Sequence, residues 1–139
     1  MQYVCDAPGR RTWFRMETDA EAEAETRLMR HAVEKYFRRE QDRARLSYQP
    51  GAGLERDIGL KGHIARSTPM FLTLRADDGE GLATAMLPPA GSRDPNFRVV
   101  IVGPENADPY EHHADAIQAL ARHVGMHLPR ERCYPYARD

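Results

Sequence analysis

The segment from Asp19 to Arg45 contains neither glycine nor proline and is rich in alanine, glutamate, leucine, methionine and arginine. These residues have high helix propensities, so the segment predicts one long helix. Thr18 followed by Glu21 is a capping-box pattern at its start, in which each side chain accepts a hydrogen bond from the other residue's backbone amide. A helix of this kind must bury one face against a sheet or another helix, which constrains the fold more than any other stretch.

The apolar residues of this segment fall on one helical face: Leu28, Met29, Ala32, Val33, Tyr36 and Phe37. Past Phe37 the apolar stripe stops. At a rise of about 1.5 Å per residue the helix would span about 40 Å, which is longer than a small domain needs. We therefore expect its last two turns to project or bend. A projecting helix also predicts self-association, or a protein partner, through residues 19–45.

Four strands are predicted from two hairpin patterns. Residues 2–6 and 12–17 flank a turn that contains Pro8 and Gly9. Residues 70–75 and 82–87 flank an Asp-Asp-Gly-Glu-Gly turn. In the first hairpin we expect Phe14 and Met16 to face the core, because alternate side chains of a strand point to the same side.

A further strand and a helix are predicted near the C-terminal end. Residues 97–102 form an apolar, β-branched run between Asp94-Pro95 and Gly103-Pro104, typical of a strand covered on both faces. A helix is expected to begin at Pro109, with an apolar stripe over residues 117–124. Gly125 suits a left-handed cap at its end.

These elements predict a single α+β domain over residues 1–139. We expect a largely antiparallel sheet of about five strands with two main helices packed on one face. Residues 46–69 carry too few apolar residues for a firm assignment, so a short strand followed by a helical turn and a helix stay as alternatives.

The charge balance and the cysteines narrow the function classes. Twenty lysines and arginines nearly match 21 aspartates and glutamates, so no global field indicates nucleic acid or an anionic membrane. No apolar run approaches the length of a membrane span or a signal peptide. Cys5 and Cys133 have no metal-type spacing, which indicates free thiols in a reducing, cytoplasmic setting.

The densest polar cluster lies between the predicted strand 97–102 and the last helix. Backbone amides at a helix start can hold an anion, and histidine with carboxylates can bind a metal. The candidate ligand-binding residues are Arg93, Arg98, Gly103, Asn106, Tyr110 and His112. Carboxylates nearby oppose an anion, and the same acids serve a helix start for its own stability, so plain capping with solvated histidines is the favoured interpretation.

Other chemistry finds little support in the sequence. His31 and Glu34 are three residues apart, which is typical of a histidine held by a neighbouring carboxylate. His123 and His127 are separated by Gly125, so a shared helical face for a metal is not expected. No glycine-rich nucleotide loop and no GxSxG pattern occurs, and no catalytic residue, metal or cofactor is predicted. Arginines of the long helix alternate with acids, which makes nucleic-acid binding a minority interpretation.

Two functions from different classes are therefore expected. The favoured one is a non-catalytic interaction or regulatory module, in a homodimer or with a protein partner. The alternative is a small enzyme or ligand-binding protein with an anion or metal site in residues 103–113.

Overall fold

A computed structural model describes residues 1–51, 55–92 and 94–135. Within them it contains a five-stranded antiparallel sheet and four α-helices, which confirms the predicted α+β class. The elements in chain order are β1 (Gln2–Ala7), β2 (Arg11–Arg15), α1 (Asp19–Met29), α2 (Val33–Ser47), α3 (Glu55–Ser67), β3 (Met70–Arg75), β4 (Gly81–Leu87), β5 (Val100–Val102) and α4 (Tyr110–Val124).

The sheet runs in sequence order from β1 to β5, and every neighbouring pair is antiparallel. The run 97–102 is shorter as a strand than predicted, because Phe97 belongs to a turn closed by its amide to Asp94 O. β5 is also an edge strand. Its outer side is partly covered by Tyr134, whose amide donates to Val99 O at 2.8 Å, while the amide of Ile101 donates to Tyr134 O.

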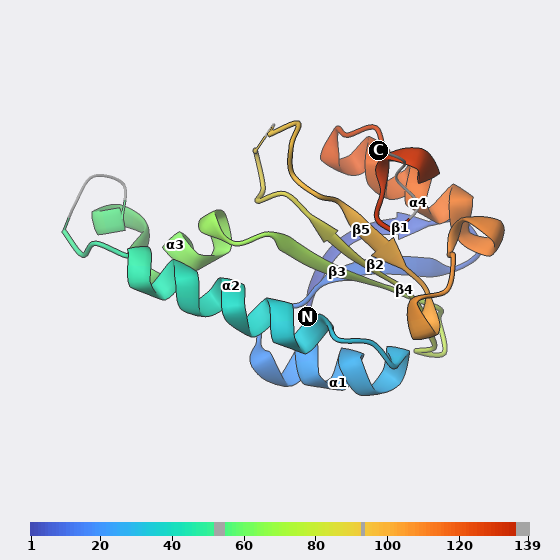
Figure 1. The fold of residues 1–139 in the computed structure, drawn as a ribbon, viewed down its shortest axis with the longest axis horizontal. Coiled ribbons are helices and arrows are strands. Elements are labelled where there is room, and N and C mark those ends of the chain that lie inside the picture. Colours follow the sequence, from blue (N-terminus) through green and yellow to red (C-terminus); the bar gives the residue numbers. More distant parts are fainter. Residues whose placement is uncertain (52–54, 93, 136–139) are drawn as a thin grey trace.

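Helices lie on both faces of the sheet, with α4 on one side and α1 and α2 on the other (Figure 1). This differs from the predicted placement of the two main helices on one face. The reason is visible in β3, where Leu72 packs towards α4 and Phe71 towards α2. Alternate side chains of the strand are thus both buried, so the strand reads as a continuous apolar run.

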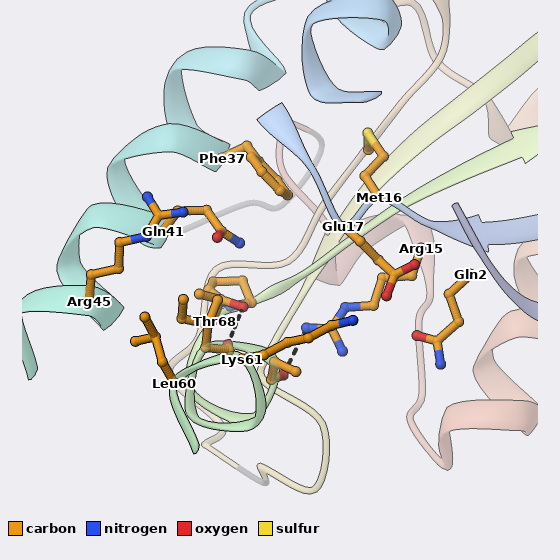
Figure 2. A pocket seen from close by; sticks show the side chains of 13 residues that line it. Gln2, Arg15, Met16, Glu17, Phe37, Gln41, Arg45, Leu60, Lys61 and Thr68 are labelled. Carbon is orange, nitrogen blue, oxygen red and sulfur yellow. Dashed lines mark hydrogen bonds between the residues drawn. The ribbon is translucent and has the colours of Figure 1, made fainter. Parts of the chain in front are cut away.

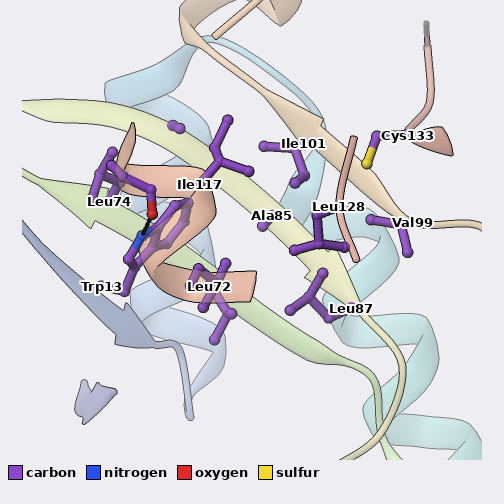
Figure 3. Packing of buried hydrophobic residues seen from close by; sticks show 13 residues of the cluster. Trp13, Leu72, Leu74, Ala85, Leu87, Val99, Ile101, Ile117, Leu128 and Cys133 are labelled. Atoms are coloured by element: carbon purple, nitrogen blue, oxygen red, sulfur yellow. Dashed lines mark hydrogen bonds between the residues drawn. The ribbon is translucent and has the colours of Figure 1, made fainter. Parts of the chain in front are cut away.

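Trp13 lies at the centre of the core under α4 (Figure 3). Its side chain is fully buried, and its indole Nε1 donates to Ala116 O at 2.9 Å. Of the two residues expected in the core of this hairpin, Met16 is buried as predicted, whereas Phe14 is only partly buried. Trp13 and Met16 are buried in different core clusters, because both faces of the sheet are covered.

The prediction of a single helix over residues 19–45 is wrong, because α1 ends at Met29 and a separate helix, α2, begins at Val33. Arg30 takes a left-handed conformation with φ of 55°. Side chains then cap the new helix: Thr26 Oγ1 accepts from Glu34 N at 2.9 Å, and His31 Nδ1 accepts from Val33 N at 3.4 Å. These bonds satisfy amides that a helix start leaves unpaired.

A buried ion pair fixes α1 on the sheet. Glu25 is fully buried, and its Oε1 lies 2.6 Å from Arg75 Nη2 of β3. Thr84 of β4 donates to the other carboxylate oxygen at 2.6 Å, and Arg75 Nε donates to Thr73 Oγ1 at 3.0 Å. A buried charge is tolerated only when it is paired and hydrogen-bonded in this way.

His31 joins the same network and not Glu34, as its sequence neighbourhood had suggested. Its Nε2 lies 2.8 Å from Thr84 Oγ1, and Glu34 instead pairs with Arg38. Burial lowers the pKa of His31 despite the nearby Glu25 carboxylate. The neutral ring therefore accepts the Val33 amide at Nδ1 and donates from Nε2 to Thr84, which donates on to Glu25.

The segment left unassigned in the sequence forms the helix α3, which packs along the end of α2. His63 is buried between them, with Nε2 at 2.9 Å from Ser47 Oγ and 3.1 Å from Ala44 O. The α2–α3 pair extends away from the sheet in Figure 1, as expected for the end of the long helical segment.

The ion pair yields a stability prediction. Replacing Glu25 with leucine is expected to lower the free energy of unfolding by about 3–5 kcal/mol, because Arg75 is then left partly buried without a counterion. Arg75→Met should cost a comparable amount. The double variant should lose less than the sum of the two single losses, since it removes both charges together. Urea unfolding of the four proteins measures this coupling, and strictly additive losses would contradict it.

Candidate functional site

The site predicted in residues 103–113 lies in a loop that is held by hydrogen bonds within the loop itself. Gly103 is buried, and its amide donates to Ala107 O at 2.7 Å, which closes the turn Pro104–Asn106. Asn106 is exposed with a positive φ of 62°. The neighbouring Glu105 reaches Arg30 after α1 at 2.7 Å, so one of the opposing carboxylates is paired.

The start of α4 is capped by a side chain. The amide of Tyr110, expected as an anion donor, donates to Asp108 Oδ1 at 2.9 Å. Asp108 Oδ2 also accepts from Arg130 Nε at 2.6 Å, and Tyr110 OH donates to Leu128 O at 3.3 Å. An anion at this position would have to displace Asp108 from the Tyr110 amide.

The remaining predicted residues are not gathered at this turn by any contact in the described part of the chain. The guanidinium of Arg98 lies over the ring of Tyr134, 5.2 Å from its centroid. His112 is exposed on the first turn of α4. Arg93 lies outside the described residues. The ligand-binding role of these residues stays a prediction.

His113 is not solvated as expected but contacts the first hairpin. Its Nδ1 lies 2.9 Å from Arg11 Nη1, while Arg11 Nη2 donates to both carboxylate oxygens of Asp115 at 2.8 Å. Burial, then the charges of Arg11 and His112, lowers the pKa of His113. The hydrogen bond from Arg11 lowers the pKa of the Asp115 carboxyl. The cluster ties the hairpin to α4 and leaves Arg11 little capacity for a ligand.

The described part of the chain shows no cluster of metal ligands and no cysteine activated as a thiolate. No group of three or more histidine, cysteine, aspartate or glutamate side chains is placed to hold a metal there. Cys5 and Cys133 are free thiols, and burial raises the pKa of both, which disfavours the reactive thiolate. None of the described helices is long and apolar enough to cross a membrane.

A pocket of about 310 Å³ lies elsewhere, between α2, α3 and the ends of β2 and β3 (Figure 2). Met16 and Phe37, each about 2 % exposed, form its floor. Ile64 and Leu60 of α3 form an apolar wall. The floor belongs to the smaller core cluster, in which Phe37 packs edge-on against Phe71 at 5.3 Å between ring centroids.

Gln41 is one of two buried polar residues in the described lining of this pocket, and Thr68 is the other. The Gln41 side chain is 9 % exposed and points into the cavity in Figure 2. Within the described residues its amide makes no hydrogen bond. The amide atoms are not fully enclosed, so the amide keeps contact with solvent through the pocket and can bond to water or to a ligand there.

Cations surround the mouth of the pocket. Among the described residues, Arg15, Arg45 and Lys61 line it together with one carboxylate, Glu17, which gives these four side chains a net formal charge of +2. Arg15 Nη2 donates to Ala65 O at 2.9 Å, so β2 holds one guanidinium nitrogen on α3. Burial lowers the pKa of the Arg15 guanidinium, with Glu17 opposing that shift, which marks a cation partly removed from water.

The other two cations are less constrained. Arg45 lies 3.5 Å from Asp42, but both side chains are more than half exposed, so this pair is weak. Lys61 is exposed and makes no ion pair with any residue that the structure describes. An anion that binds at the mouth would therefore have to displace only the weak contact of Arg45 with Asp42, and no ion pair of Lys61.

This pocket was not predicted from the sequence, although the sequence contains one feature that indicates it. Phe37, Gln41 and Ala44 are spaced i, i+4 and i+7, so they share one helical face. Glutamine in that row is a polar residue at a position that faces the core. Arg15 and Lys61 carry no such local signal, since the fold brings them together from β2 and α3.

Comparisons of this chain with protein-family models, with curated proteins and with solved structures find no match.

Proposed function

We propose that this protein is a non-catalytic regulatory domain that binds a small molecule in the pocket between α2, α3 and β2. The observation that supports this most directly is Gln41, a residue about 9 % exposed whose amide faces an open pocket with an apolar floor. Ligand pockets typically combine an apolar lining with a few convergent polar groups. At about 310 Å³ the cavity is at the small end of that class.

A binding role is favoured over catalysis by the chemistry of the lining. The described residues that line the pocket supply cations, amides, one hydroxyl and one carboxylate, but no histidine or cysteine. Thr68 is the hydroxyl, and its Oγ1 already donates to Ile64 O at 2.8 Å. The lining thus offers groups that hold a ligand and no activated nucleophile beside a base. The proposal keeps the cytoplasm as the location, because both cysteines are free thiols.

The predicted self-association is a second candidate, favoured by exposed apolar side chains on the helices that lie on the α1 side of the sheet. Leu28 of α1 is 47 % exposed, Tyr36 of α2 is 42 % exposed and Leu46 of α2 is 89 % exposed. Leu60 of α3 is also 42 % exposed. A second copy covering the end of α2 would remove Leu46 from water, which is favourable by about 1.5–3 kcal/mol for a fully buried leucine.

A fragment screen tests the binding role. Chemical-shift mapping of ¹⁵N-labelled protein against a mixed library of acids, amines and neutral fragments should give hits on Gln41, Leu60 and Ala65. Ala65 is exposed and lines the pocket, so Ala65→Trp is expected to obstruct the cavity and abolish these shifts. The matched control Arg66→Trp places the same ring at the adjacent exposed position, outside the lining, and should preserve them.

Hits that survive Ala65→Trp would contradict the pocket as the binding site. Hits that map to residues 103–113 would instead support the alternative site at the start of α4. A library without any hit on the protein would overturn the binding role itself.

Self-association is tested by light scattering coupled to size-exclusion chromatography. The parent protein is expected to run as a dimer at micromolar concentrations. Leu46→Glu should weaken the dimer at least about tenfold, because a buried carboxylate at the contact would lack a partner. Tyr3→Gln changes another exposed large side chain, on β1, which is 58 % exposed, and should leave the dimer intact. A parent protein that is monomeric across the accessible range would exclude this candidate.

A further inference from the structure

The pocket is divided into two chemically distinct parts. Its depth is apolar, with Met16 and Phe37 below and Ile64 beside them. Its mouth is cationic, with Arg15 and Lys61 coming from elements that face each other across the opening. In Figure 2 both side chains extend towards the same opening of the cavity. A ligand that fills the pocket must therefore be apolar at one end and anionic at the other.

The charge of the ligand is bounded by Glu17. This carboxylate lines the same rim as the cations and lies close enough to Arg15 to oppose the lowering of its pKa. A second negative charge on the ligand would meet Glu17, whereas a single charge is held by Arg15 and Lys61. Charge-assisted bonds to a guanidinium are about twice as strong as neutral ones, and the partly desolvated Arg15 is the more effective donor.

Gln41 adds a third requirement. Its side chain lines the same pocket and carries an amide with one acceptor oxygen and two donor hydrogens. A ligand without a hydrogen-bonding group near Gln41 would displace water from the amide without forming a hydrogen bond in its place. One polar group, or the inner oxygen of the anionic group itself, satisfies the amide.

Resting on the proposed function, we infer that the ligand is a small organic monocarboxylate with an apolar or aromatic body. The carboxylate lies between Arg15 and Lys61, the body lies on Met16 and Phe37, and Gln41 bonds a polar atom of the ligand. The class includes aryl and short-chain alkyl carboxylic acids, and dianions such as phosphate monoesters are the competing class that the test separates from it.

The test compares three probes that share a phenyl ring on the same protein, of which the carboxylate and the amide are isosteric. Phenylpropanoate, the neutral phenylpropanamide and the dianionic phenyl phosphate are titrated against ¹⁵N-labelled protein at constant ionic strength. The carboxylate is expected to shift the resonances of Gln41 and Ala65 and to bind at least about tenfold tighter than the amide, as one charge-assisted bond implies. Phenyl phosphate should bind more weakly than the carboxylate.

Two variants separate the roles of charge and amide. Lys61→Gln removes an exposed cation without an ion pair, so folding should be unaffected, and carboxylate affinity should fall several-fold while amide affinity stays constant. Gln41→Leu should weaken both probes. Arg98→Gln, which removes an arginine stacked on Tyr134, is the matched control and should change neither affinity.

The outcomes distinguish the ligand class from the site. If the amide binds the pocket as tightly as the carboxylate, or if Lys61→Gln weakens both equally, the monocarboxylate class is wrong while the binding role stands. If phenyl phosphate binds most tightly, the class is wrong in favour of dianions. If the carboxylate does not shift the pocket resonances at all, the inference is overturned, and the fragment screen decides separately whether the pocket binds anything.

Discussion

The position of α1 depends on the ion pair between Glu25 and Arg75. A carboxylate that is fully removed from water must find all its partners at once, and here they come from two adjacent strands, β3 and β4. This demand fixes both the rotation of α1 and its height above the sheet. Because Thr26 and His31 of the same segment cap α2, the ion pair also sets the direction in which α2 leaves. The wall of the pocket that carries Gln41 is thus placed by a charge pair at the other end of the layer.

The pocket lies at the other end of this helical layer. Where α1 lies on the sheet, Glu25, Arg75 and Thr84 satisfy one another, whereas at the pocket the amide of Gln41 has no partner among the described residues. Gly81 contributes to the close contact on the first side, because a Cβ there would lie 2.7 Å from the sulfur of the buried Met29. On the second side the lining keeps an apolar floor and an unpaired amide. The unequal distance of the helical layer from the sheet is therefore the structural origin of the site.

Elements with local signals could be predicted from the sequence, and those determined by distant residues could not. The turns of both hairpins and the left-handed cap at Gly125 follow from residue types at fixed offsets, and they were predicted correctly. The break at Arg30 has no glycine or proline to announce it, since Thr84, Thr26 and Glu25 stabilise it from elsewhere in space. The candidate loop 103–113 was recognised as a polar cluster, but the pairing of Asp108 with Arg130 depends on a residue beyond α4. Arg15 and Lys61 meet only because α3 folds back over β2.

The contact of Tyr134 with β5 has a consequence for how the sheet can grow. Sheets extend by adding strands to an edge whose amides and carbonyls are unpaired. At β5 the backbone of Tyr134 already occupies the groups of Val99 and Ile101. Among the described residues the outer side of β1 has no strand partner, and the register shift between Tyr3 and Cys5 interrupts its hydrogen-bonding row. A sheet with one accessible edge can at most join a single second copy edge to edge, since the joined pair then ends in two covered strands. Open-ended stacking into fibres needs two accessible edges, and the described part of this fold offers one.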